Sequence, residues 1–214
     1  MKIKGIHEGG SGKIGNLVSC YRYGKYYLRT LPAKVKQPNT PKQLAARQKF
    51  KLAQAFASTI KEFAQFGFAA YAQQRTAYSA AISYLLNNAF SGEYPDIELD
   101  YNKVRVTIGT RPTAKEVEMN FSNKILQINW LDTYEIRQTY AHDAVVILLV
   151  DPSRRWHSSY FGKAVRNDAS LELCPQIPDS CSNIHVYLSF YGQNILNGKI
   201  NEKDISHSIY CGQL

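Results

Sequence analysis

The first ninety residues of this 214-residue chain have almost no acidic side chains. Only Glu8 and Glu62 stand against 14 lysines and arginines, which gives this part a net charge of +12. Residues 91–214 carry 12 lysines and arginines against 15 acids, a net charge of −3. Such a difference between two halves indicates an interaction surface in the basic half.

The chain also lacks a long apolar run. The longest one, Ala144–Val150, has seven residues, whereas a membrane-spanning helix needs about 20. No apolar stretch follows the lysines near the N-terminus, so this segment is unlike a signal peptide. We therefore expect a cytoplasmic protein without membrane contact, or a virion-associated one if a phage encodes it.

Cysteines at metal-binding spacing are absent. Cys20, Cys174, Cys181 and Cys211 form no C-x-x-C pair, so we expect reduced, buried thiols. Three of them can be combined with His185 into a Cys3His set, but the spacing matches no common zinc module. We expect no bound metal.

Motifs for nucleotide binding and catalysis are incomplete. The segment GGSGK resembles part of a phosphate-binding loop, but the full motif requires glycine at position 7 and serine or threonine at position 14. The chain has His7 and Ile14 there. It has no G-x-S-x-G elbow, and its five histidines are scattered. We expect a non-enzymatic protein without a cofactor or small-molecule substrate.

The beginning of the chain predicts a β-hairpin. Two β-rich runs, about residues 14–22 and 25–31, flank Tyr23 and Gly24. Gly24 suits the turn because glycine accepts a positive φ. A basic, proline-rich segment follows, and its prolines predict an extended arm up to residue 39.

Two helices are predicted after this arm. Thr40 is a suitable N-cap, Pro41 suits the first helical position, and Gln43 completes a capping box. Apolar residues at three- and four-residue spacing extend this helix to Phe66. A second helix, about residues 69–90, follows so closely that an antiparallel helical hairpin is expected.

After Gly92 the hydrophobic period changes to that of short strands. The predicted strands lie near residues 102–109, 116–121, 124–130, 143–150, 158–164, 169–174, 183–191 and 205–211. Seven or eight short strands in this length are typical of an antiparallel sandwich.

These elements predict an α+β protein: an N-terminal β-hairpin plus an antiparallel helical hairpin, followed by a seven- to eight-stranded antiparallel β-sandwich. We divide it into a basic module at residues 1–92, an acidic linker at residues 93–101 and a sandwich domain at residues 102–214. The acids of the segment EYPDIELD are expected to be solvated rather than part of a metal or glycosidase site.

Two resemblances refine this prediction. The run ILQINW at 125–130 resembles an early strand of a fibronectin type III or immunoglobulin-like sandwich, with Trp130 on its core face. The run IHVYLSFYG at 184–192 resembles the tyrosine-bearing sixth strand of that fold. The Cys…Trp…Cys pattern of a disulfide-linked immunoglobulin domain is absent. The architecture is implied, but no particular function comes with it.

The second resemblance covers nearly the whole chain. GKIGNLV at 12–18, GKYYLRTLP at 24–32, TPKQLAARQKFKLA at 40–53 and SIYCG at 208–212 resemble an uncharacterised family of about this length that is common in Bacteroidota. A similar N-terminal pattern occurs in proteins of phages and mobile elements. The resemblance implies a fold, and no established activity comes with it.

A dense run of cations marks the candidate binding surface. Ten lysines and arginines lie between Lys13 and Lys51 with no acid among them, and tyrosines alternate with them in the hairpin. The candidate residues for binding nucleic acid or a protein partner are Lys13, Arg22, Tyr23, Lys25, Tyr26, Arg29, Lys34, Lys36, Lys42, Arg47, Lys49 and Lys51.

Two functions remain open at this point. One is a structural or interaction protein that assembles with itself or with a protein partner, through its basic module and its sandwich. The other is a sequence-nonspecific nucleic-acid-binding protein of a phage, mobile element or nucleoid, because phosphates require uncompensated cations and tyrosines can stack on bases.

A secondary interface candidate is the group Arg154, Arg155 and Trp156, between two predicted strands. An exposed tryptophan beside two arginines is typical of an interface hot spot. In the alternative, Trp156 folds back over the sandwich with an arginine stacked on its ring.

Overall fold

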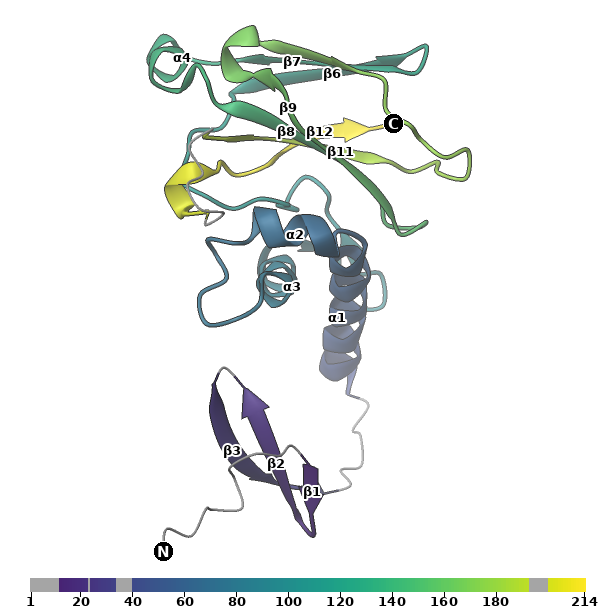
Figure 1. The fold of residues 1–214 in the computed structure, drawn as a ribbon. Helices are drawn as coiled ribbons and strands as arrows, with labels where there is room; N and C mark the ends of the chain where they lie inside the picture. Colours follow the sequence, from purple (N-terminus) through teal and green to yellow (C-terminus); the bar gives the residue numbers. More distant parts are fainter. Residues whose placement is uncertain (1–11, 23, 34–39, 193–199) are drawn as a thin grey trace, which may run out of the picture. The chain divides into compact units, whose positions relative to one another are not determined.

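The computed structural model describes residues 12–22, 24–33, 40–192 and 200–214 (Figure 1). The chain divides into two compact units, residues 1–39 and residues 40–214. We describe each unit by itself.

The first unit contains one three-stranded antiparallel sheet in the order β1-β2-β3. Its strands are β1 (Gly12–Ile14), β2 (Leu17–Arg22) and β3 (Lys25–Thr30). The predicted hairpin is confirmed, with Gly24 at φ +79° in the turn between β2 and β3. A second turn, with Gly15 at φ +57°, separates β1 from β2. Most of the predicted basic arm, residues 34–39, lies outside the described residues.

The second unit begins with helices α1 (Pro41–Thr59), α2 (Lys61–Gly67) and α3 (Ala77–Asn88). The single helix predicted to residue 66 is wrong, because it is broken at Ile60, where φ is −100° and ψ is 21°. Ile60 is fully buried, and the break lets residues of both α1 and α2 reach the same hydrophobic cluster. Three helices therefore replace the predicted two-helix hairpin.

The two threonines that start helices differ in their capping. Pro41 occupies the first turn of α1 as predicted, but the side chain of Thr40 makes no capping hydrogen bond. The predicted capping box with Gln43 is wrong, since the Gln43 amide donates to the Thr40 backbone carbonyl at 3.0 Å. At α3, by contrast, Oγ1 of Thr76 accepts from the Ser79 amide at 3.1 Å.

Strands follow in the order of the chain. They are β4 (Phe90–Ser91), β5 (Glu98–Leu99), β6 (Glu116–Ser122), β7 (Ile125–Leu131), β8 (Ala144–Asp151), β9 (Trp156–Val165), β10 (Ser170–Leu173), β11 (His185–Tyr191) and β12 (Ile209–Gln213). They form three antiparallel sheets with the orders β4-β5, β10-β7-β6 and β12-β11-β8-β9. A short helix, α4 (Tyr134–Tyr140), precedes β8 and was not predicted.

The strand predicted at residues 102–109 is wrong. Val104 and Val106 are buried, but this segment has no strand partner. The Val106 amide donates instead to the Ser208 side chain at 2.8 Å, and the Ser208 amide donates to the Thr107 carbonyl at 3.2 Å. These contacts also explain why β12 begins at Ile209 rather than near 205, since residues 206–208 are bonded to this segment.

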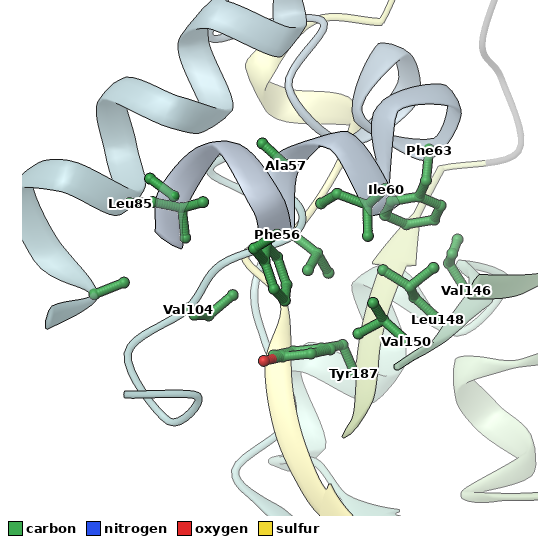
Figure 2. Packing of buried hydrophobic residues seen from close by; sticks show 13 residues of the cluster. Phe56, Ala57, Ile60, Phe63, Leu85, Val104, Val146, Leu148, Val150 and Tyr187 are labelled. Atoms are coloured by element: carbon green, nitrogen blue, oxygen red, sulfur yellow. The ribbon is translucent and has the colours of Figure 1, made fainter. Parts of the chain in front are cut away.

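The four-stranded sheet lies in the middle of the second unit, since its central strand β8 is buried on both faces. On one face, Val146, Leu148 and Val150 pack with residues of α1, α2 and α3, as Figure 2 shows. On the other face, Val145, Ile147 and Leu149 share a cluster with residues of β7 and β10. Because side chains alternate along β8, one face of this strand packs against the helices and the other packs against the β10-β7-β6 sheet.

The segment predicted as an acidic linker contains local structure. Its strand β5 pairs with β4, and Ile97 is buried. Three of its four acids, Glu93, Asp96 and Glu98, are exposed as predicted, whereas Asp100 is half-buried and pairs with Lys103 at 2.9 Å. Gln48 of α1 donates from Nε2 to the Pro95 carbonyl at 2.7 Å. The helices before this segment thus contact it and also share a core with β8 and β11.

Candidate functional site

Strand register separates the side chains of the N-terminal sheet into two unlike faces. Val18 lies opposite both Lys13 of β1 and Arg29 of β3, and Arg22 lies opposite Lys25. Because side chains alternate along a strand, Val18 and Arg22 point to the same side. This basic face therefore carries Lys13, Arg22, Lys25 and Arg29, together with Cys20 and Tyr27.

The opposite face is apolar, and none of its described residues is charged. The register places on it Ile14, Leu17, Ser19, Tyr21, Tyr26 and Leu28, with Gly12 and Thr30 at the sides. Tyr21 and Tyr26 are cross-strand partners, and their ring centroids are 4.5 Å apart. We call this the apolar face. The predicted mixing of tyrosines with cations is therefore only partly right, since Tyr26 lies opposite the cations and Tyr27 lies among them.

The large side chains of the apolar face are exposed to solvent, although Ser19 on the same face is buried. Ile14 is 54% exposed, Tyr21 57% and Tyr26 44%. All six residues of β3 are exposed, and Ser19 is the one buried residue among the described residues of this unit. Burying large apolar side chains is the main source of folding free energy, at about 25 cal/mol per Å². A three-stranded sheet with one hydrophobic face is at the lower limit for independent stability, so covering that face would add free energy of folding.

The remaining candidate residues lie elsewhere. Tyr23, Lys34 and Lys36 are outside the described residues. Lys42, Arg47 and Lys51 are exposed on α1, in the second unit, while Lys49 is half-buried with its Nζ 6.0 Å from the Phe90 ring centroid. At 100° per residue, Arg47 and Lys51 lie on one side of α1, and Lys42 and Lys49 lie on another.

Trp156, the secondary candidate, is half-buried against the cluster between the two larger sheets. Arg154 and Arg155 are exposed in the preceding turn. Buried Asp151 holds this turn, because its Oδ1 accepts from the amides of Ser153 and Arg154 at 3.0 and 3.2 Å. Burial raises the pKa of Asp151, but its hydrogen bonds outweigh this and lower the pKa overall. This placement agrees with one part of the alternative, that Trp156 covers the core, but no arginine of the described residues is stacked on its ring.

A buried ionic network lies beside the same cluster. Arg166 is fully buried, and its guanidinium donates to both carboxylate oxygens of Asp132, at 3.0 and 3.1 Å, and to the Pro112 carbonyl at 2.6 Å. Its Nε is 3.5 Å from Asp143, which also accepts from Arg111 at 2.5 Å. Its Cζ lies 3.8 Å from the Phe190 ring centroid. Because the guanidinium is enclosed, we assign this network to structure rather than to ligand binding.

His185 is a buried histidine in the core of the second unit. Its ring stacks on Tyr101 with centroids 3.5 Å apart, and Nδ1 lies 3.0 Å from the Tyr210 hydroxyl oxygen. Nε2 is buried and has no hydrogen-bond partner among the described residues. Burial lowers the pKa of His185 to about 4, although Asp151 opposes this shift. His185 is therefore neutral at pH 7 and held by packing.

The cysteines are free thiols, but the prediction that they are buried is wrong, since three are half-buried and one is exposed. Cys174 is exposed, because alternation points Leu173 into the core and turns the next residue outward. Cys20, Cys181 and Cys211 are half-buried. Burial raises the pKa of Cys211 to about 12. Within the described ranges no three His, Cys, Asp or Glu residues are grouped to hold a metal ion.

One pocket of about 600 Å³ opens beside the β10-β7-β6 sheet of the second unit. Phe121, Ile177, Ile184 and Cys181 contribute to its lining. Burial raises the pKa of the Cys181 thiol, and Asp151 adds to this effect. A thiol with a raised pKa is a poor nucleophile at neutral pH. The pocket therefore offers apolar contacts rather than covalent chemistry.

The comparisons with known proteins identify a family. A family of unknown function, DUF6266, matches residues 9–212. The chain belongs to this family. The DUF6266 match includes the N-terminal sheet and extends over nearly all of the second unit. Neither the comparison with curated proteins nor that with solved structures found a match. No helix in the described part of this DUF6266 chain is long and apolar enough to cross a membrane.

Sequence reasoning found the cations of this site but missed the apolar face. The signal was present, because Leu17, Tyr21, Tyr26 and Leu28 occupy alternating positions in their strands. What the sequence did not contain was the register, which places these two alternating sets on the same side of the sheet.

Proposed function

We propose that this DUF6266 protein is a non-enzymatic interaction protein that docks onto a protein partner through the apolar face of its N-terminal sheet. The observation that carries this proposal is the exposure of five large apolar side chains on one face of the N-terminal sheet, a face without a charge among its described residues. Exposed apolar patches bounded by polar residues are typical of interaction sites. The second unit acts as the folded body that carries this sheet.

We also propose that the two larger sheets form a fibronectin type III-like sandwich. The first, second and fifth of its strands (β6, β7 and β10) form one sheet, and the others (β8, β9, β11 and β12) form the second. This division of strands is typical of that fold. Trp130 lies buried on the second strand, and residues of both sheets share one cluster. Such sandwiches serve many unrelated functions, so this likeness supports an architecture only.

Site-specific photocrosslinking in cells tests the docking proposal. Tyr26 and Tyr27 are adjacent in β3 but point to opposite faces of the sheet. A photoreactive phenylalanine analogue at position 26 should give a discrete protein adduct, and the same group at position 27 is the matched control. Equal protein adducts from both positions, or adducts from position 27 alone, would contradict docking through the apolar face.

A second candidate function is nucleic-acid binding through the basic face. Lys13, Arg22, Lys25 and Arg29 lie on it together, and Tyr27 lies among them. Four cations on one face can displace counterions from a phosphate backbone, and an adjacent tyrosine can stack on a base. This binding leaves the apolar face available, so the two functions are compatible.

DNA retardation at several salt concentrations tests this second candidate. With four phosphates neutralised, the logarithm of the binding constant should fall with the logarithm of the salt concentration with a slope of about −3.6. Reversing Lys13, Lys25 and Arg29 to Glu should abolish retardation. The matched control changes Lys42, Arg47 and Lys51 of α1 to Glu. This variant should keep most of the DNA retardation of the unmodified chain. No retardation of the unmodified chain at low salt rules the candidate out.

A further inference from the structure

We infer that the occupant of the apolar face is the same face of a second copy of this chain, so that two N-terminal sheets stack face to face. This inference rests on the proposed docking function and names its partner. It is supported by the charge, the shape and the area of the face.

Charge distinguishes the two faces as surfaces for self-association. The basic face carries Lys13, Arg22, Lys25 and Arg29, so two copies of it would repel each other. The apolar face has no charged residue among those described, so two copies can approach without desolvating an ion. Stacking through the apolar face also leaves the four described cations of each basic face pointing away from the partner copy.

Shape makes the apolar face complementary to itself. Tyr21 and Tyr26 form its end nearest the hairpin turn, and Ile14 and Leu17 form the other end. Between these ends Ser19, which is buried, lies opposite Gly12 on one side and Leu28 on the other. A two-fold axis that lies between the stacked faces, perpendicular to the strands, places Tyr21 of one copy over Leu17 of the other and Tyr26 over Thr30. Two-fold pairs of identical surfaces are the commonest form of homo-oligomer.

The area is sufficient for a specific but modest interface. Ile14, Leu17, Tyr21, Tyr26 and Leu28 are each between 36% and 57% exposed. Stacking two such faces at the usual sheet spacing buries on the order of 1,000 Å² in total, which is the lower limit for a specific interface. We therefore expect a concentration-dependent dimer rather than a permanent one.

Sedimentation of the purified full chain over a range of concentrations tests this inference. The unmodified chain should form dimers. Leu28→Lys places a charge on the apolar face and should raise the dimer dissociation constant about tenfold or more. Tyr27→Lys, on the adjacent residue and the opposite face, is the matched control and should leave the dimer intact. Circular dichroism of both variants checks that the second unit remains folded.

Two sedimentation results overturn the inference. One is a chain that stays monomeric at every concentration, and the other is a dimer that Leu28→Lys leaves unchanged. Hydroxyl-radical footprinting of Tyr21 and Tyr26 then separates the inference from the docking proposal. If the chain is monomeric and both tyrosines react freely, the second copy is ruled out while the docking face stands. If the chain is monomeric and both are protected, residues of its own chain cover the face and both proposals fail.

Discussion

The central strand of the second unit and the edge strand of the N-terminal sheet show how differently two parts of this chain are stabilised. All eight residues of β8 are buried, between a helical layer and a second sheet. All six residues of β3 are exposed. Both strands are rich in apolar side chains, so apolar composition alone does not determine burial. On each face of β8 other elements of the second unit pack against the strand, whereas among the described residues of the first unit no second layer packs on β3.

Charge follows the same division. Residues 1–39 carry eight lysines and arginines against Glu8, a net charge of +7, whereas residues 40–214 carry 18 against 16 acids, a net charge of +2. Some charged side chains of the second unit are buried in ion pairs, as in the Arg166 network. The first unit keeps its described cations on the surface. The second unit thus combines a core with nearly balanced charge, whereas the described part of the N-terminal sheet combines an exposed apolar face with a cationic one.

The largest effect is expected where a buried charge is left without its partner. Arg166→Ala leaves the buried Asp132 and Asp143 without their shared cation, so the free energy of unfolding should fall by about 3–5 kcal/mol. Chemical denaturation measures this change. The exposed Arg154→Ala is the matched control and should change it by less than about 0.5 kcal/mol. A loss below about 1 kcal/mol for Arg166→Ala would show that this network does not hold the second unit together.

Aromatic truncation compares the two units directly. Phe56→Ala removes a fully buried ring from the cluster between the helices and β8, which should lower the free energy of unfolding by about 3–5 kcal/mol. Tyr26→Ala removes an exposed ring of the N-terminal sheet and should leave the unfolding of the second unit within about 0.5 kcal/mol. Similar losses from both variants in thermal denaturation would contradict the independence of the second unit.

Acid should weaken the second unit through His185. Its pKa is about 4 in the folded chain against 6.5 for the ordinary side chain, so between these pH values the unfolded chain binds a proton that the folded chain does not. The free energy of unfolding therefore falls as the pH drops from 6.5 to 4, by at most about 1.4 kcal/mol per pH unit from this group. His185→Phe should reduce that slope in urea unfolding at several pH values. An unchanged slope contradicts a buried neutral histidine.

A smaller effect separates the two helix starts. Thr76→Ala removes a side-chain hydrogen bond to the Ser79 amide and should cost about 1 kcal/mol. Thr40→Ala removes no capping bond and should cost less than about 0.5 kcal/mol. Urea denaturation of both variants measures the difference. Equal costs would mean that Thr40 caps α1 after all.

Local patterns in the sequence predicted most of the elements. Alternation located seven strands between residues 116 and 213, and Gly24 located the hairpin turn, because both signals depend on neighbouring residues. The segment at 102–109 alternates in the same way but is bonded to Ser208 outside any sheet. The break at Ile60 depends on packing against β8 and β11, which are distant in sequence. Such contacts leave no local signal.

The candidate site shows the same limit. The density of cations between Lys13 and Lys51 is visible in the sequence, and four of these residues do share one face. The chain order did not reveal that Lys42, Arg47, Lys49 and Lys51 belong to another unit. The apolar face required the strand register, which depends on turn geometry as well as on pattern.

Amide hydrogen exchange at two protein concentrations tests most directly the claim that the N-terminal sheet needs a partner and the second unit does not. The account predicts that the amides of β2 and β3 exchange rapidly in dilute solution and become protected as the concentration rises, while β8 and β11 stay protected throughout. Protection of β2 and β3 that is strong and independent of concentration would contradict it.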